Sequence, residues 1–283
     1  MRYKAILFLI GMALIIMACE NDSPLEPDYE QVVIQAYLYA GEPVDDIQIT
    51  KTIPMGSETG SPEPINDAAV RLIKGGRTYD LTPAGGDSGY YEYSGTDLTV
   101  QTDDEFTLEV DYFDRTASGS TTVPPPPYNV TQSNDTIVIP INPANPSFVF
   151  DTTVYQISVS WQAEEQDADN YFFVAFECVD SRTDTIPKWP MQRGLPGRFV
   201  DMPQIQTYYP VIFEDFFFFG LHKLTVYSIN QEYVDLYISR VQNSRELNEP
   251  LTNISNGLGV FSAFNSKSVF FTTVREDSVT AAP

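Results

Sequence analysis

The sequence is poor in histidine, cysteine and basic residues, and each shortage excludes a class of protein. Of its 283 residues, one is histidine and two are cysteine. Zinc sites built from several histidines and disulfide frameworks need more of these residues, so neither is expected. Lys and Arg number 16 against 39 Asp and Glu, which gives a formal net charge of −23. A chain this negative repels phosphate backbones, so nucleic acid is excluded as a partner.

Apolar residues, in contrast, make up 42% of the sequence and aromatic residues 13%. This content is too high for a disordered acidic chain, so a folded protein is expected. The length suits one large or two medium domains. Phosphate-binding glycine loops, zinc-ligand spacings and nucleotide-binding fingerprints are missing, so we expect no cofactor and no bound metal.

The N-terminal stretch has the composition of a cleaved secretion signal. Two basic residues, Arg2 and Lys4, precede an uncharged apolar run from Ala5 to Ala18. As a helix at 1.5 Å per residue this run spans about 21 Å, which is short of the roughly 30 Å of a bilayer core. Residues 1–18 are therefore interpreted as a signal peptide rather than an uncleaved membrane anchor.

The end of this stretch, Ile16-Met17-Ala18-Cys19, resembles the lipobox of bacterial lipoproteins. The resemblance implies that Cys19 is acylated, with palmitate-type chains, once the signal has been removed. Each buried methylene contributes about 0.8 kcal/mol, so several acyl chains would make attachment to the membrane effectively permanent. The alternative is an ordinary secreted protein with a cysteine there by chance.

The segment after the lipobox, residues 19–30, holds five acidic residues, two prolines and no basic residue. Such a composition predicts a solvated tether. Acidic residues after a lipidated cysteine also resemble the signal that sends some lipoproteins to the outer face of the outer membrane. We therefore expect a lipid-anchored outer-membrane protein, with the cell-surface face favoured over the periplasmic face.

Residues 31–122 contain a succession of short strands. Apolar and polar or aromatic residues alternate over 32–39, and Ile47, Ile49 and Ile53 alternate with polar neighbours. The adjacent glycines Gly75 and Gly76 predict a hairpin turn between strands at 70–73 and 77–82. With further strands at 90–93, 98–100 and 106–112, the pattern predicts an antiparallel β-sandwich.

Four consecutive prolines follow Val123, and they predict a stiff extended linker over residues 123–127. A second domain is expected over 128–275, with a tail at 276–283. Its predicted strands are 155–161 and 171–179, followed by a final pair at 260–264 and 269–273. A long excursion from Ser181 to Tyr209 is rich in Pro, Gly and Arg and is either functional or irregular packing.

One helix is predicted in this second domain, at about 229–243. Ser228 to Gln231 matches a capping box, and Val234, Tyr237, Ile238 and Val241 form one apolar stripe. The predicted fold class is therefore mainly β, with two antiparallel β-sandwich-like domains, the second carrying one amphipathic helix.

Several stretches together resemble a family of uncharacterised outer-membrane lipoproteins, domain of unknown function 4249. They are Gln31 to Ala40, Asp67 to Val70, Gly89 to Tyr91, Tyr233 to Tyr237 and Asn253 to Phe261. The resemblance implies a lipid-anchored β-protein, often encoded beside TonB-dependent receptors, and it brings no catalytic residues with it. Separately, residues 67–110 resemble the carboxypeptidase regulatory-like, transthyretin-type sandwich.

Candidate chemical groups are few, and each has a structural interpretation. His222 is the one possible imidazole base, but it opens an alternating strand and is expected to be a strand-edge histidine. Cys178 lies in a continuous apolar run and is expected to act as a small hydrophobic residue. The acidic stretches 103–105 and 167–170 could bind Ca²⁺, although solvated turns are favoured. No catalytic residue is assigned, and an enzyme is not expected.

Aromatic residues concentrate in the second domain and form a candidate binding patch. They are Trp189, Tyr208, Tyr209, Phe216, Phe217, Phe218 and Phe219. Such rings could stack on sugars or meet a partner's apolar surface, but core packing is the favoured alternative. Consecutive phenylalanines in a strand cannot all face one core, so this stretch is the best candidate for an interface.

These observations predict a lipid-anchored outer-membrane accessory or binding protein, associated with a TonB-dependent receptor. Two alternatives stay open. One is a surface hydrolase that uses carboxylates on a glycan or peptide, since 39 acidic residues bring some pairs together by chance. The other is an adhesin or envelope spacer. The sequence does not identify the ligand.

Overall fold

The computed structural model describes residues 31–53, 61–139, 156–163, 170–180, 184–186, 198–212, 217–241 and 251–276. The strands in chain order are β1 (Val32–Tyr39), β2 (Asp46–Lys51), β3 (Ala69–Lys74), β4 (Arg77–Pro83), β5 (Tyr90–Glu92), β6 (Glu105–Tyr112), β7 (Arg115–Thr122) and β8 (Tyr128–Gln132). They continue as β9 (Thr136–Ile139), β10 (Gln156–Gln162), β11 (Tyr171–Cys178), β12 (Arg198–Val200), β13 (Tyr208–Ile212), β14 (Gly220–Ile229), β15 (Ile254–Ser255) and β16 (Leu258–Arg275), with helix α2 (Gln231–Val241) after β14. The predicted mainly β, sandwich-like fold with one helix is confirmed.

Most strands join one thirteen-stranded sheet. Its order is β12-β11-β14-β16-β1-β2-β5-β4-β3-β6-β7-β15, with β9 also paired to β16. A smaller sheet has the order β13-β10-β8. The pairings are antiparallel except for β1 with β16 and β16 with β9, which are parallel. Parallel neighbours need a long connection, which here is most of the chain between β1 and β16.

Two large hydrophobic cores and a third, smaller cluster occur among the described residues, and alternation within the strands builds them. In β1, Val32, Ile34, Ala36 and Leu38 face the first core, while Tyr37 and Tyr39 face the other side of the sheet. The predicted hairpin between β3 and β4 is present, and the positive φ angles of its turn, 56° and 78°, fall on the two glycines Gly75 and Gly76.

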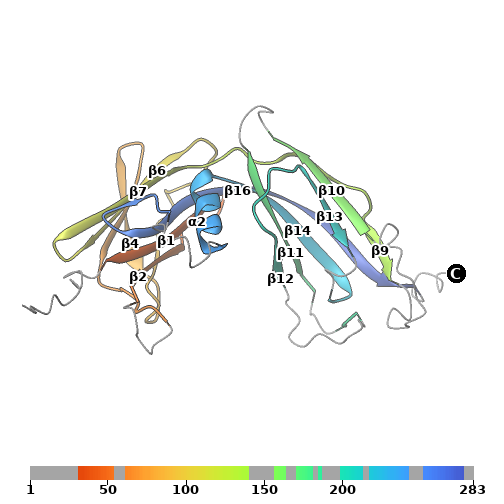
Figure 1. Ribbon diagram of the computed structural model, residues 1–283, viewed down its shortest axis with the longest axis horizontal. Helices are drawn as coiled ribbons and strands as arrows, with labels where there is room; N and C mark the ends of the chain where they lie inside the picture. The colour runs from red at the N-terminus through yellow and green to blue at the C-terminus, as the bar shows by residue number, and fades with distance from the viewer. Residues whose placement is uncertain are drawn as a thin grey trace, which may run out of the picture. The chain divides into compact units, whose positions relative to one another are not determined.

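Strand β16 belongs to both halves of the fold. Its first part pairs with β1 from Leu258 to Phe264, and its second part pairs with β14 from Phe264 to Thr273. Figure 1 shows this strand running from beside β1 to beside β14 and β9. Phe261 and Ala263 complete the first core, and Phe271 lies in the second. The two halves therefore share one strand.

The final strand pair predicted at 260–264 and 269–273 is wrong, because both stretches are parts of β16. The polar residues between them, from Asn265 to Ser268, resemble a turn in the sequence. In the structure they keep their ladder partners on β14; Lys267 and Ser268 are exposed, whereas Asn265 is buried. These polar residues therefore do not form a turn. They lie within one continuous strand, at the point where its neighbours change from β1 to β14.

Other local differences have similar causes. The strand predicted at 98–100 is absent, and Ile53, predicted to be inward-facing, is 49% exposed beyond the end of β2. Strand β7 was not predicted because its buried positions are small or polar ones, such as Ala117 and Gly119. Two short strands after the prolines, β8 and β9, were also missed.

The predicted helix is present as α2, but its capping box is not. Ser228 is part of β14, where it pairs with Phe172 and Asn265. Because α2 begins at Gln231, Ser228 lies too far before the helix to cap it. The side chain of Gln231 donates to Asp235 at 2.7 Å rather than reaching back. The N–H groups of Tyr233 and Val234 bond to the carbonyl oxygen of Asn230. No helix among the described residues is long and apolar enough to cross a membrane.

Candidate functional site

Several of the candidate site residues from the sequence lie outside the described ranges: Cys19, Trp189 and Phe216. Of the remaining aromatics, Tyr208 is exposed on β13, and its hydroxyl lies 3.0 Å from that of Ser158. Its neighbour Tyr209 points to the opposite face and is buried in the second core. The strand geometry therefore separates these two rings.

The phenylalanine stretch is largely interior where it is described. Phe218 and Phe219 are buried and Phe217 is half-buried. The ring of Phe219 packs in the second core with the guanidinium carbon of Arg275 above it, 4.5 Å from the ring centroid. The structure thus brings Tyr209 and Phe219 together inside one core and leaves Tyr208 at the surface.

His222 is a core residue of β14. Its side chain is 3% exposed, its ring stacks on Phe271 with centroids 5.2 Å apart, and its Nδ1 lies 3.0 Å from the carbonyl oxygen of Gly220. Burial lowers the pKa of the imidazole, so the neutral form is favoured. Cys178 is its direct neighbour on β11 and is also buried. Neither group is accessible to a substrate as the fold stands.

The acidic stretches offer no metal site within the described residues. Asp104 forms an ion pair with Lys74 and accepts the N–H of Gln101, so its carboxylate is occupied. Asp103 has a positive φ of 66° and is exposed. Residues 167–169 lie outside the described ranges. No group of three or more His, Cys, Asp or Glu with metal-binding geometry occurs in the part of the chain that is described.

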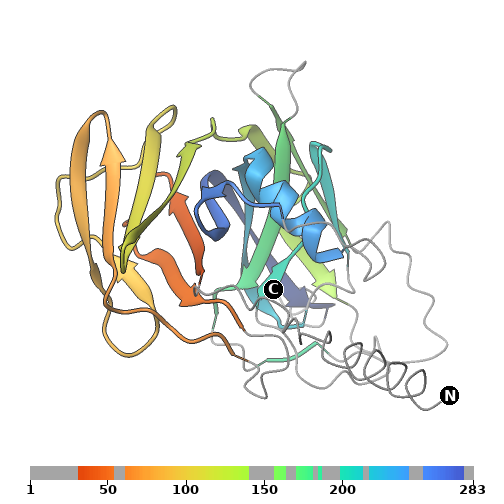
Figure 2. The same ribbon diagram turned by 60° about the vertical axis from the view of Figure 1, so that its left-hand side comes forward.

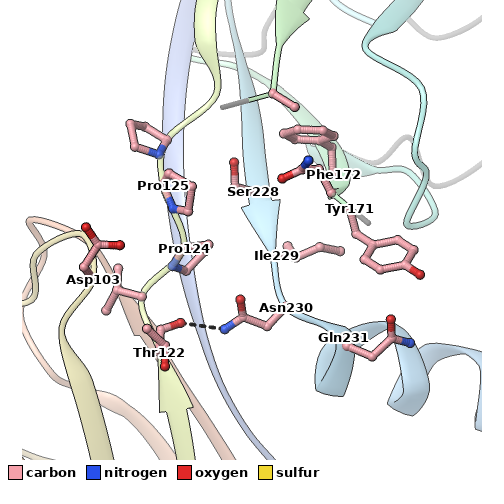
Figure 3. Close-up of a pocket in the computed structure, with 14 residues that line it drawn as sticks. Asp103, Thr122, Pro124, Pro125, Tyr171, Phe172, Ser228, Ile229, Asn230 and Gln231 are labelled. Atoms are coloured by element: carbon pink, nitrogen blue, oxygen red, sulfur yellow. Dashed lines mark hydrogen bonds between the residues drawn. The ribbon is translucent and has the colours of Figure 1, made fainter. Parts of the chain in front are cut away.

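A cavity of about 270 Å³ lies where the proline segment passes the ends of β11 and β14 (Figure 3). We call it the proline cavity. Its described lining is drawn from five stretches of chain: Asp103, Thr122 to Pro126, Ala163, Asn170 to Phe172, and Ser228 to Gln231. These stretches are far apart in sequence, so only the completed fold forms the cavity.

The proline wall of this cavity is held by side-chain amides. Asn265 donates from Nδ2 to the carbonyl oxygen of Pro124 at 2.9 Å. Asn230 donates from Nδ2 to the carbonyl oxygen of Thr122 at 2.7 Å and to the Thr121 hydroxyl at 3.1 Å. Prolines have no N–H to donate to a neighbouring strand. Hydrogen bonds from the two side-chain amides to main-chain carbonyl oxygens therefore hold this segment where strand pairing cannot. The segment predicted as a linker is thus a wall with defined partners.

The cavity presents uncommitted polar groups beside apolar ones. The carboxylate of Asp103 and the hydroxyl of Ser228 make no side-chain hydrogen bond among the described residues. In Figure 3 the side-chain oxygen of Asn230 points up between Pro124 and Ile229 while its nitrogen faces Thr122. The half-buried rings of Pro124 to Pro126 supply apolar surface. Hydroxyl, amide and carboxylate groups of this kind recognise a ligand through hydrogen bonds.

A second concave surface, which we call the helix groove, lies between α2 and the segment 202–206. It has a volume of about 560 Å³ and is lined by Tyr171, Met202, Pro203, Gln204, Ile205, Gln206, Val234 and Tyr237. Met202 and Ile205 are 59% and 68% exposed. The Nε2 atom of Gln204 is buried without a hydrogen-bond partner. The groove therefore combines exposed apolar side chains with an unsatisfied donor.

Helix α2 lies against the face of the sheet (Figure 2), and aromatic rings pack between the two. Tyr233 of the helix packs edge-on against Tyr37 and Phe264, with centroids 5.9 Å and 5.0 Å apart. Val234 joins the same cluster with Phe173. Edge-to-face pairs of this kind each contribute about 0.5–1.5 kcal/mol beyond area burial.

Sequence reasoning missed both concave surfaces. The prolines look like a spacer because their partner Asn265 is 141 positions away. The apolar residues of 202–206 fall in a stretch with no periodicity, so nothing in their spacing indicates which of them are exposed. The one available signal was that residues 202–206 belong to the long irregular stretch from Ser181 to Tyr209, because such loops are often functional.

Comparison with known proteins gives one family match. A family model described as domain of unknown function (DUF4249) matches residues 20–269. No curated protein sequence matches the chain. Among solved structures, a crystal structure of domains from titin aligns with a TM-score of 0.23 and 12% identity, covering 87% of this chain and 66% of that one. This chain therefore spans slightly under two thirds of the titin structure, and so distant a likeness carries no argument.

Proposed function

The chain belongs to the DUF4249 family, and from this premise we propose that it is a non-enzymatic, lipid-anchored binding protein of the outer membrane that docks onto a receptor protein in the same membrane. Two features support the proposal. The sequence Ile16 to Cys19 supplies an anchor site, and the helix groove supplies a docking surface. The groove is the observation that carries the proposal.

The apolar residues of the groove favour a protein partner. Met202 and Ile205 expose most of their side chains within a few residues of each other, together with Pro203. Covering such a surface gains roughly 25 cal/mol per Å² of apolar area removed from water. The described lining carries no charged side chain, so salt has little direct effect on this contact.

The Gln204 amide favours a polypeptide segment in the groove. A buried donor without a partner costs about 1–3 kcal/mol, and a carbonyl oxygen of the partner would remove that cost once a shift of the Gln204 side chain brings its buried Nε2 to the groove surface. The main chain of Gln204 pairs with Phe172 in both directions at 2.8 Å, so the backbone at this position is fixed. A segment of the receptor with apolar side chains and an accessible main-chain carbonyl meets both requirements.

Co-purification tests this function. The lipidated protein, extracted in mild detergent, is expected to enrich a receptor barrel. The double variant Met202→Glu/Ile205→Glu should reduce that enrichment at least tenfold, because burying two carboxylates is costly. Phe113→Glu is the matched control, since Phe113 is 82% exposed at the β6–β7 turn and lies outside the groove. Unchanged enrichment in the double variant, or no receptor barrel with the native chain, would overturn the proposal.

Lipid attachment is tested separately. Cys19→Ala should remove the mass added by the acyl chains and release the protein into the aqueous phase of a detergent partition. Equal partitioning of the variant and the native chain would contradict the lipid anchor. The groove contact would then depend on the co-purification result alone.

A further inference from the structure

We propose that the proline cavity binds one ring of a neutral saccharide. The inference is independent of the receptor partnership, because the cavity and the helix groove present different side chains apart from Tyr171, which lines both. It rests on four properties of the cavity: its size, its charge, its free polar groups and its apolar surface.

The size suits a small ligand. At about 270 Å³ the cavity is below the roughly 300–1,000 Å³ typical of pockets for drug-sized molecules. It would hold on the order of nine waters at about 30 Å³ each. One sugar ring fits such a space, and the chain of an oligosaccharide could continue out through the open side.

The charge excludes anionic ligands. Asp103 is the one charged side chain among the described lining residues, and none of them is Lys or Arg. The chain as a whole carries −23. Phosphorylated, sulfated and carboxylated ligands would therefore be repelled, and a neutral ligand is favoured.

The free polar groups match a row of ligand hydroxyls. Ionised Asp103 is an acceptor with two oxygens, Ser228 can donate and accept, and the side-chain oxygen of Asn230 can accept. Neighbouring hydroxyls of a sugar ring can donate to the carboxylate together and accept from the serine. A primary amine would use the carboxylate but leave the serine donor without an acceptor, so a polyol satisfies this set better.

The conformation of Asp103 places its carboxylate at the cavity. Its φ of 66° puts it in the left-handed region, and its N–H donates to the carbonyl oxygen of Val123 at 3.0 Å. The carbonyl of Asp104 in turn accepts from the Val123 N–H at 2.9 Å. This reciprocal pair ties the acidic turn to the proline wall. In Figure 3 Asp103 stands on one side of the proline segment, and Tyr171 and Phe172 stand on the other.

The apolar surface suits the C–H faces of a sugar. The rings of Pro124 to Pro126 are half-buried and form the accessible part of this surface. Phe172 and Ile229 lie behind it and are almost fully buried, with the Phe172 ring packed edge-on against Trp161 at 5.6 Å between centroids. Sugar rings have alternating polar edges and apolar faces, which is the combination that these walls offer.

Saturation-transfer NMR on the full-length protein in mild detergent tests the inference, with free glucose, galactose, mannose and N-acetylglucosamine as probes at millimolar concentration. At least one of them is expected to bind. Asp103→Asn and Ser228→Ala should each weaken its binding about three- to tenfold, through the loss of one hydrogen bond. Ala163→Phe, which fills the cavity, should abolish binding.

The control is Asp80→Asn, which removes an exposed carboxylate on β4 without touching the cavity. Unfolding midpoints of all variants establish that each is folded. Absence of binding for all four sugars, or equal binding in Asp103→Asn, Ser228→Ala and the native chain, would overturn the inference. Binding of ethanolamine in place of the sugars would also overturn it. The cavity variants should leave enrichment of a receptor barrel unchanged, so failure here is distinct from failure of the proposed function.

Discussion

Asn265 on β16 donates a hydrogen bond from Nδ2 to the main-chain oxygen of Pro124, at 2.9 Å, and to the Thr102 hydroxyl at 3.0 Å. The amide lies at the point where β16 leaves β1 and joins β14. One buried side chain therefore ties the shared strand to the proline wall and to the turn before β6. The wall of the cavity depends on this side chain as well as on its own rings.

Asn265→Ala should lower the free energy of unfolding by about 1–3 kcal/mol, because a buried carbonyl oxygen and a hydroxyl lose their donor. Chemical denaturation measures the change. Asn134→Ala is the control, since Asn134 is exposed and bonds only the hydroxyl of its neighbour Ser133. Equal stability of the two variants would mean that the Pro124 contact contributes nothing.

Gly259 allows β16 to approach β1. A Cβ built there would lie 1.9 Å from the carbonyl oxygen of Ile34, and its φ of +105° is one that other residues rarely adopt. Gly259→Ala should therefore cost about 3 kcal/mol or more in unfolding free energy, from strain and a broken ladder. Gly85→Ala, where a Cβ meets nothing within 4 Å, should change stability by less than about 0.5 kcal/mol. A similar effect at both positions would contradict the close approach.

Tyr39 donates to Oδ2 of Asp46 at 3.2 Å, on neighbouring strands. Burial raises the pKa of Asp46 above its ordinary 3.8, although the Tyr39 bond works against the rise. A raised pKa means that the folded protein holds this proton more tightly, so the contribution to stability is largest below pH 3.8 and is lost as pH rises through the folded value.

Asp46→Asn should therefore stabilise the protein at pH 7, by up to about 1 kcal/mol for a half-exposed carboxyl, and the gain should vanish near pH 3.5. The variant keeps an acceptor for Tyr39. Urea unfolding at the two pH values measures the difference, with Asp80→Asn as the exposed control. A gain of the same size at both pH values would show that removal of the charge is not its cause.

His222 gives the opposite pH dependence. Burial lowers the pKa of its imidazole below the ordinary 6.5, so the unfolded chain takes up this proton first as the pH falls. Stability should decline as the pH falls below about 6.5, with a limiting slope of about 1.4 kcal/mol per pH unit. Because His222 is the one histidine of the chain, His222→Phe should flatten this part of the curve. Phe also preserves a ring to stack on Phe271. An unchanged slope would contradict the burial.

The sequence predicts strands well where burial alternates between large apolar and polar residues. Strand β1 is recognised for this reason, since every second residue from Val32 to Leu38 is buried. Prediction from the sequence fails where the buried positions of a strand hold small residues, as at Gly119 of β7. A Cβ added at Gly119 would meet the side chain of Ile254. The size of Ile254, from near the other end of the chain, makes glycine necessary, and a local pattern cannot report such a constraint.

The candidate sites are harder to predict for the same physical reason. The position of Asp103 depends on a left-handed backbone, and the position of the prolines depends on a hydrogen bond from β16. Of the predicted aromatic patch, Tyr208 is exposed while Tyr209, Phe218 and Phe219 are buried. Composition indicates that aromatic residues gather there, but orientation requires the completed sheet.

The shared strand also sets the order in which the protein can fold. Residues 32–122 emerge from the ribosome long before Leu258 to Phe264, which pair with β1 and bring Phe261 and Ala263 to the first core. Until then β1 keeps an unpaired edge, which is a template for aggregation. Loop closure across so much chain slows folding. We therefore expect the folding chain to need a chaperone that shields β1 until its last partner arrives.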